Sequence, residues 1–212
     1  MKKLILAIVA ATFMINMSSA QDEPIDLRDN LTFGIKVGAN LSNVYDSKGE
    51  DFNADAKLGL ATGIFLGIPL GKYLGIQPEL LYSQKGFKAT GRLLGIDYEF
   101  NRKTSYLDVP LLIALKPSSM LTILAGPQYS FLLKEKNDFK NKVLSGGLQK
   151  EFDNENLRKN TLCLTGGVDI NLDNLVLSGR AGWDLKENNK DGTSTTPRYK
   201  NVWLQATIGF RF

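Results

Sequence analysis

The sequence contains no histidine and a single cysteine, Cys163, among its 212 residues. The absence of histidine excludes Ser-His-Asp and Cys-His catalysis and the common zinc sites that include histidine. One cysteine in an exported chain leaves no internal disulfide framework. We therefore expect a protein that is not an enzyme, with no catalytic residues, no cofactor and no bound metal.

Long hydrophobic runs are also missing, except at the start of the chain. Residues 1–20 read MKKLILAIVAATFMINMSSA, where two lysines precede a short apolar run, and Ser18 and Ala20 occupy the −3 and −1 positions of a cleavage site. This pattern predicts a cleaved signal peptide, because the apolar run is shorter than the roughly 20 residues of a spanning helix. No later window is apolar enough for a membrane helix, so any crossing of a membrane must use strands.

An excess of one charge is missing as well. Lys and Arg number 26 and Asp and Glu 22, and removal of the leader with Lys2 and Lys3 brings the two signs closer. No basic run interrupts the chain, so we expect no nucleic acid among the partners.

What the chain does contain is a two-residue period. Residues 21–31 form a polar, periplasmic lead-in, and the rest predicts one barrel domain over 32–212. Its eight runs alternate apolar with polar or small residues: 32–42, 58–68, 74–83, 106–115, 121–131, 162–170, 175–185 and 202–212. Each run is close to the ~9–11 residues that a tilted transmembrane strand needs.

The connections between the runs alternate in length. Three are tight and rich in turn-forming residues, at 69–72, 116–119 and 171–174. Four are long, at 43–57, 84–105, 132–161 and 186–201. This layout is typical of outer-membrane proteins with short periplasmic turns and long outer loops. It predicts an all-β fold, an eight-stranded antiparallel up-and-down transmembrane β-barrel in the cell outer membrane.

The composition of the two faces indicates which one is buried. A soluble lipocalin-like barrel would have the same period with apolar residues inside. Here the apolar face has no charged residue, and a charge at mid-bilayer costs roughly 2–4 kcal/mol. The other face is rich in glycine, which makes room in a narrow lumen. It also carries seven nearly balanced charges, which we interpret as a structural lumen cluster: Lys36, Glu79, Asp108, Asp169, Arg180, Asp184 and Arg211. A lumen filled in this way predicts no porin-like conductance.

Aromatic residues near the ends of the runs are typical of interfacial girdles. Those expected toward the long loops are Tyr82, Tyr129, Phe131 and Trp183, and those at the periplasmic rim are Phe210 and Phe212. Trp203 is an exception, because it falls on the lumen face.

Three prolines, Pro78, Pro110 and Pro127, lie inside the predicted strands. A proline removes a hydrogen bond from the ladder of a sheet. We expect a local bulge or kink at these positions, and the alternative is a deliberately weakened seam in the wall.

Four stretches, FGIKVGANLSN, GIQPELLYSQKGF, YLDVPLLIALKP and LAGPQYSFLL, resemble the PorT-like outer-membrane β-barrel proteins of Bacteroidota. The resemblance runs from about residue 32 to Phe212 and implies an eight-stranded outer-membrane barrel. It also implies insertion by the barrel-assembly machinery, which reads a C-terminal strand that ends in an aromatic residue. It supplies no catalytic residues, and the link of the founding member to type IX secretion is not transferred to this chain.

Several functions remain open at this point. The leading hypothesis is a structural or binding barrel, surrounded by outer-membrane lipid, whose long loops contact something outside the cell. The second is an accessory subunit of a secretion or envelope complex. An outer-membrane enzyme using acid pairs such as Glu79 and Asp108, and a soluble periplasmic barrel, are the remaining alternatives.

Overall fold

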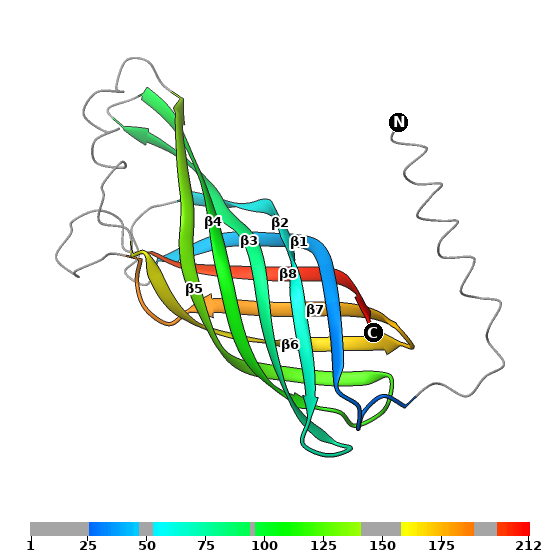
Figure 1. The fold of residues 1–212 in the computed structure, drawn as a ribbon. Coiled ribbons are helices and arrows are strands. Elements are labelled where there is room, and N and C mark those ends of the chain that lie inside the picture. Colours follow the sequence, from blue (N-terminus) through cyan, green and yellow to red (C-terminus); the bar gives the residue numbers. More distant parts are fainter. Residues whose placement is uncertain (1–25, 47–52, 94–95, 141–157, 189–198) are drawn as a thin grey trace, which may run out of the picture.

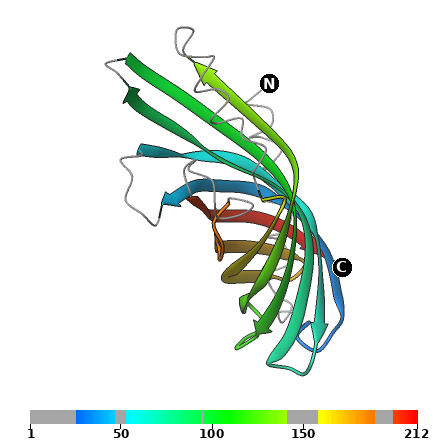
Figure 2. The same cartoon turned by 90° about the vertical axis from the view of Figure 1, so that its left-hand side faces the viewer.

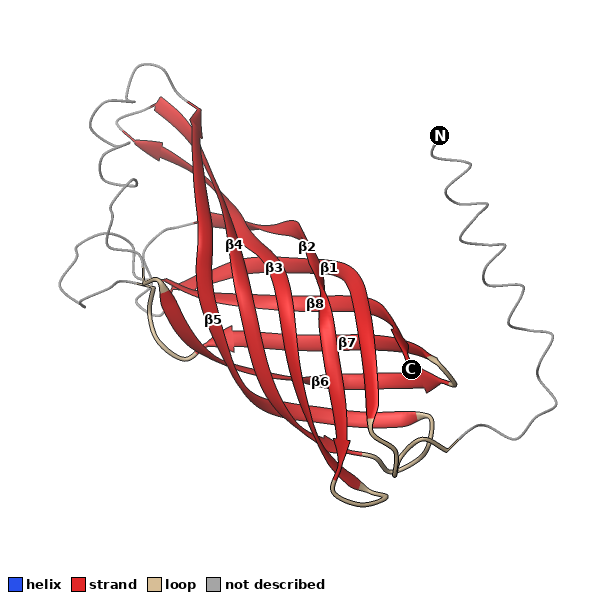
Figure 3. Ribbon diagram, in the orientation of Figure 1, coloured by secondary structure: helices blue, strands red, loops and turns tan. Residues whose placement is uncertain are grey.

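The computed structural model describes residues 26–46, 53–93, 96–140, 158–188 and 199–212. Its eight strands close into a single barrel (Figures 1 and 3). They are β1 (Thr32–Asp46), β2 (Asn53–Pro69), β3 (Leu74–Leu93), β4 (Ile96–Leu115), β5 (Leu121–Lys140), β6 (Asn160–Leu172), β7 (Leu175–Asp184) and β8 (Tyr199–Arg211). All neighbours pair antiparallel, including β1 with β8, so the predicted eight-stranded up-and-down barrel is confirmed. The predicted signal peptide, residues 1–20, lies outside the described residues.

The two ends of the barrel differ in their connections. The turn end carries the short connections 70–73, 116–120 and 173–174, together with the start of β1 and the end of β8. The loop end carries the remaining connections, whose residues 47–52, 94–95, 141–157 and 189–198 lie outside the described ranges. The part of the chain that the structure describes contains no helix long and apolar enough to cross a membrane.

The structure corrects the prediction of a long loop over 84–105. β3 and β4 continue through this stretch as a paired ribbon, from Gln84 opposite Ser105 to Leu93 opposite Ile96. β5 also continues to Lys140, inside the predicted loop 132–161. We name residues 84–93, 96–105 and 132–140 the extension. Figures 1 and 2 show it rising beyond the ends of the other strands. Charged and apolar residues share one face of these strands, as Lys85 does with Phe87 and Arg102 with Phe100, which is why the two-residue period did not reveal them.

The prolines do not displace the register. The pairing passes through Pro78, Pro110 and Pro127 without a shift, so the predicted bulge at these positions is wrong. The ladder is nevertheless interrupted beside them, at residues 79–80 opposite 109–110 and at residues 111–112 opposite 126–127, because a proline has no N–H to donate. The register shifts instead occur at residues 56–61 of β2 and 105–106 of β4. Both lie at the base of the extension, where a bulge bends a strand and increases its twist.

The barrel closes where its first and last strands meet. β1 pairs with β8 from Gly34 opposite Arg211 to Asp46 opposite Tyr199. The terminal amide of Phe212 donates a 2.7 Å hydrogen bond to the carbonyl of Phe33, and the two rings stack with centroids 6.2 Å apart. This pairing removes the two sheet edges that an open barrel would expose.

Burial is inverted relative to a soluble barrel. On the outer face, Ile35, Ile113 and Leu204 are each at least half exposed. On the inner face, Lys36 and Gln205 are buried, with relative exposures of 3% and 6%. The wall therefore presents hydrocarbon outward and encloses its polar groups.

Candidate functional site

The candidate site is the lumen, where all seven charged residues singled out in the sequence are buried. Their relative exposures run from 1% for Asp108 to 9% for Arg211. Charges buried in this way are very costly unless they are paired and hydrogen-bonded. Their partners therefore determine what the lumen can do.

A four-charge cluster occupies the lumen toward the turn end. Lys36 Nζ lies 2.6 Å from Glu79 Oε2, and Arg180 Nη1 lies 2.7 Å from Asp169 Oδ1. Arg180 Nη2 also lies 3.5 Å from Glu79 Oε1, which joins the two pairs. Gln77 Nε2 donates to Glu79 Oε1 at 2.8 Å. Two cations and two anions cancel, so the cluster is a closed, neutral network that links β1, β3, β6 and β7.

A second ion pair lies toward the loop end and includes a residue that the sequence did not single out. Lys85 Nζ lies 3.0 Å from Asp108 Oδ2, with both side chains 1% exposed. The same ammonium sits 3.8 Å from the ring centroid of Trp203 and 4.9 Å from that of Tyr106. Lys85 was missed because it lies just past the third apolar run, and its aromatic partner is on β8. The one available signal was that Lys85 continues, at two-residue spacing, the series of lumen-facing residues along β3.

Trp203 is the large residue on the lumen face, and Gly182 leaves the space that its ring occupies. A Cβ built on Gly182, which pairs with Trp203 across β7 and β8, would lie 2.3 Å from the indole ring. The ring is 4% exposed. The indole therefore fills the upper lumen, and Lys85 caps one of its faces.

Asp184 and Cys163 form a third polar group near this level. The Cys163 thiol donates to Asp184 Oδ1 at 3.1 Å, while Asn201 donates to Asp184 Oδ2 through its amide N (3.0 Å) and Nδ2 (2.6 Å). Cys163 is 0% exposed. A nucleophile without accessible surface gives no route to a substrate, so this group contributes to the packed interior.

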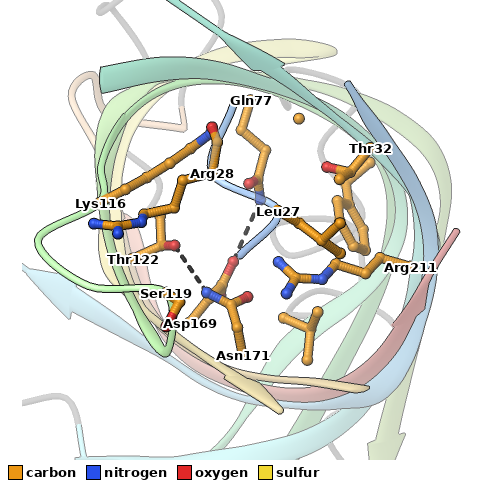
Figure 4. Close-up of a pocket in the computed structure, with 13 residues that line it drawn as sticks. Leu27, Arg28, Thr32, Gln77, Lys116, Ser119, Thr122, Asp169, Asn171 and Arg211 are labelled. Carbon is orange, nitrogen blue, oxygen red and sulfur yellow. Dashed lines mark hydrogen bonds between the residues drawn. The ribbon is translucent and has the colours of Figure 1, made fainter. Parts of the chain in front are cut away.

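The turn-end mouth is covered by the lead-in residues that precede β1. Leu27, Arg28, Lys116 and Arg211 converge inside the rim (Figure 4). Lys116 Nζ donates to the carbonyl of Arg28 at 2.8 Å, and Arg211 Nε donates to the carbonyl of Asp173 at 2.8 Å. The cavity that remains is about 30 Å³, room for one or two water molecules. Burial lowers the pKa of Lys116.

The loop-end mouth is closed by an aromatic and ionic group. Arg102 donates from Nη1 to the Tyr199 hydroxyl, and its Nε lies 3.3 Å from Glu135 Oε1. The rings of Phe87 and Tyr199 meet edge to face, with centroids 5.2 Å apart. Three of these residues belong to the extension, so the same segment that rises beyond the barrel also covers its opening.

The aromatics predicted for the interfaces lie on the outer face. Tyr129 and Phe131 meet edge to face with centroids 4.8 Å apart, and Trp183 is 44% exposed. Phe210 and Phe212 lie at the turn end, with centroids 5.1 Å apart. Tyr82 is only partly exposed because its hydroxyl donates to Ser105 Oγ at 3.0 Å.

The chemistry available in this lumen is pairing and space filling. Within the described residues, no group of three or more metal-ligating side chains is placed to hold a metal ion. The buried carboxylates Glu79, Asp108 and Asp169 are each occupied by a cation. The geometry therefore supports a rigid, filled barrel whose accessible surfaces are its outer wall and its two ends.

Comparison with known proteins gives one family match. A family model described as "Outer membrane protein beta-barrel domain" matches residues 19–187. No curated protein matches the sequence.

Three solved structures are similar in fold. The attachment invasion locus protein Ail of Yersinia pestis is 12% identical over 85% of this chain and 98% of that chain, with a TM-score of 0.45. Neisserial surface protein A is 13% identical over 85% and 97%, with a TM-score of 0.46. OprG of Pseudomonas aeruginosa is 13% identical over 85% and 95%, with a TM-score of 0.45.

Proposed function

The chain belongs to the outer membrane protein beta-barrel domain family, and from this premise we propose that it is an integral outer-membrane barrel with a filled lumen, serving a structural or binding role through its loop end. It is not a diffusion pore in this proposal. The observation that carries it is the inverted burial, with paired charges such as Lys36 and Glu79 inside and side chains such as Ile113 outside. No enzymatic activity is proposed, because the lumen carboxylates are paired and the single thiol is enclosed.

Embedding in the outer membrane is tested by fractionation of cells that produce the full chain. We expect recovery with the outer membrane, and a folded form that runs differently from the boiled form in an SDS gel. Recovery of folded protein in the soluble fraction without detergent would contradict the proposal and favour a soluble periplasmic barrel.

The absence of a pore is tested in planar lipid bilayers. The folded protein should give no stable steps of nanosiemens size, because Leu27 and Arg28 cover one mouth and Arg102 with Tyr199 covers the other. A boiled sample gives the background. Reproducible nanosiemens steps that appear only with folded protein would overturn the filled-lumen function.

The orientation and processing follow from the same proposal. The turn end faces the periplasm and the loop end faces outward, as is typical of barrels with short and long connections. Residues 1–20 are then a signal peptide that is removed on export, and 21–31 are a periplasmic lead-in. The mass of the purified mature chain and its accessibility to protease on intact cells check both points.

The partners proposed are outer-membrane lipid around the wall and the barrel-assembly machinery during insertion. Support for the second comes from the C-terminal strand, which closes the sheet and ends at Phe212. Phe212→Ala should lower the yield of inserted barrel in cells, while refolding of the purified variant into detergent proceeds.

The second candidate function is that of an accessory subunit of a secretion or envelope complex, in line with the resemblance of the sequence to the PorT-like proteins of Bacteroidota. Among the described residues, positions 133–140 of β5 pair with β4 alone, and such a strand edge can accept another chain. Mild detergent extraction of wild type and of a variant with a shortened extension is the test. Defined partners that are lost with the extension would support this function, and purification of the barrel alone would contradict it.

A further inference from the structure

The outward face of the extension carries a group of lysines directly above the apolar wall. On β4 and β5 the outward row runs from Leu107 opposite Phe131, through Ser105 opposite Lys134, to Lys103 opposite Lys136. The three lysines are all exposed. The row that faces hydrocarbon lower down thus continues into a row of ammonium groups.

The position of these lysines matches the headgroup level of a bilayer. Each residue advances about 3.3 Å along a strand, and the ~45° tilt of a transmembrane strand reduces this to roughly 2.3 Å along the membrane normal. The polar region of a bilayer adds roughly 5–8 Å on each side of its hydrocarbon core. Lys134 lies three residues beyond Phe131 across the register shift, and Lys103 lies four residues beyond Leu107, so they stand roughly 7 and 9 Å above the last apolar row. A lysine stem can bend along apolar surface to keep its ammonium in the polar layer.

Neutral polar groups form a platform beside the lysines. The Tyr82 hydroxyl donates to Ser105 Oγ at 3.0 Å and accepts from Gln84 Nε2 at 3.2 Å. The Gln84 amide is oriented in turn, because its Oε1 accepts from the Leu60 N–H at 3.4 Å. Tyrosine at this level is typical of a membrane interface, with the ring in the apolar region and the hydroxyl in the polar one.

The positive charge of the group is only partly neutralised. Lys103 and Lys136 stand directly opposite each other, an arrangement of like charges that destabilises a sheet unless an anion lies between them. Asp138 lies 3.3 Å from Lys136 in an exposed pair. In the described ranges no acidic side chain lies within ion-pair distance of Lys103 or Lys134.

Lys57 brings a further ammonium group to the same place from β2. Its Nζ donates to Asn101 Oδ1 at 2.5 Å, and Asn101 belongs to the same outward row of β4, beyond Lys103. Burial, and next the charge of Lys103, lower the pKa of Lys57. Asp138 opposes this lowering of the pKa, and Lys136 adds to it. Four lysines from three strands therefore gather at the base of the extension, three of them exposed and Lys57 half-buried.

We propose that this lysine patch, Lys57, Lys103, Lys134 and Lys136 beside Tyr82, binds the phosphate groups of lipids in the outer leaflet. Each ammonium donates to phosphate oxygens, and a bound phosphate between Lys103 and Lys136 relieves their repulsion. The proposal rests on the proposed function, because it requires the loop end to lie at the outer surface of the membrane.

The test uses the full mature barrel, folded in maltoside micelles, and lipid A as the phosphate-bearing probe. Binding is counted by native mass spectrometry, with dephosphorylated lipid A as the matched lipid and inorganic phosphate alone as the soluble anion. Wild type should bind lipid A at least about tenfold more tightly than the dephosphorylated form. Combined Lys103→Gln, Lys134→Gln and Lys136→Gln should remove about tenfold or more of that affinity, because each lysine near a lipid surface contributes substantially. Inorganic phosphate at millimolar concentration should not displace the lipid.

The control removes the same number of lysines away from the patch, by Lys72→Gln in the turn between β2 and β3 and by Lys186→Gln and Lys200→Gln beside β7 and β8. This variant should keep its affinity within about twofold. Equal loss in both variants, no loss in the first, equal binding of dephosphorylated lipid, or displacement by inorganic phosphate would each overturn the proposal. Fractionation of both variants distinguishes failure of the lysine patch from failure of the proposed function. A barrel that stays in the outer membrane but shows no lipid A preference refutes the patch alone, and a soluble barrel refutes the proposed function.

Discussion

The wall formed by β3, β4 and β5 and the wall formed by β6, β7 and β8 differ in length, although both cross the same membrane. The three strands of the long wall have 20 residues each, whereas those of the short wall have 13, 10 and 13. The ~9–11 residues that a bilayer requires are present in both. The bilayer therefore accounts for the short wall almost completely, and half of the long wall exists for another reason.

The two walls are joined across the lumen rather than only through their neighbours in the sheet. Arg180 of β7 reaches Glu79 of β3, and Lys85 of β3 lies on Trp203 of β8. These contacts join two charged side chains of the long wall, Glu79 and Lys85, to Arg180 and the Trp203 ring of the short wall. Four sets of variants test how the two walls differ, in order of decreasing expected loss of stability.

Removal of the cation that links the walls should have the largest effect. Arg180→Met leaves Asp169 without its partner and Glu79 with Lys36 alone, and loss of one member of a buried ion pair costs about 3–5 kcal/mol. The free energy of unfolding, from urea titration in lipid vesicles followed by tryptophan fluorescence, measures this. Adding Asp169→Asn should recover part of the loss. An Arg180→Met barrel within about 1 kcal/mol of wild type would show that the walls hold together without the cluster.

An arginine placed on the outer face should show where the membrane ends on each wall. Leu111→Arg on the long wall and Val168→Arg on the short wall both lie in the middle of the apolar band and should each cost about 2–4 kcal/mol. Leu133→Arg, at the base of the extension, should cost about 0–1 kcal/mol. The same urea titration compares the three. Equal costs at Leu111 and Leu133 would mean that the hydrocarbon reaches into the extension.

Overpacking should test how the short wall accommodates its largest lumen side chain. Gly182→Val places a branched side chain against the Trp203 ring, since a Cβ there would lie 2.3 Å away. Such overpacking costs about 1–3 kcal/mol. Gly179→Ala on the same strand is the control, because its Cβ would meet nothing within 4 Å. A neutral Gly182→Val would show that the indole can move out of the lumen.

Shortening the long wall should have the smallest effect. Residues 90–99 are replaced by an Asn-Gly turn, which joins Ala89 to Phe100 in a two-residue hairpin. The replaced residues lie beyond Phe87 and Arg102, which close the mouth, and a two-stranded ribbon adds little stability by itself. The free energy of unfolding should therefore stay within its ~10–15% extrapolation uncertainty. Removing Ser178 and Gly179 from β7, by contrast, leaves that strand too short to cross and should abolish folding. A shortened ribbon that fails to fold would make the extension part of the barrel's core.

The sequence predicted the membrane-crossing part of the barrel well, because the bilayer penalises each misplaced charge. Ile35 and Lys36 therefore alternate between outside and inside, and eight such runs gave the topology. The same reasoning fails beyond the band, where the outward face no longer needs to be apolar and the inward face mixes charged Lys85 and Arg102 with Phe87. Residues 84–93 looked like a loop for that reason, although they form the outer half of β3.

The residues of the lumen were predictable, but most of their partners were not. Alternation assigned Asp108 to the lumen face, yet its partner Lys85 comes from the stretch that looked like a loop. Asp184 is held by Asn201, which lay in a predicted loop before β8. Partners of this kind depend on the stagger of the closed sheet, and nothing local in the sequence encodes it. The bulges at the base of the extension were missed for the same reason. The prolines, where a bulge or kink was predicted, do not displace the register.

The seam between β1 and β8 has a consequence for the order of events in the life of the chain. Synthesis proceeds from the amino end, so β1 is made long before β8, and the sheet stays open until β8 pairs with β1. Contacts between such distant parts of a chain form slowly, and during that interval strands with apolar faces are exposed to water and prone to aggregate. Closure of the sheet is thus a single late step in folding, and until that step β1 keeps an unpaired edge.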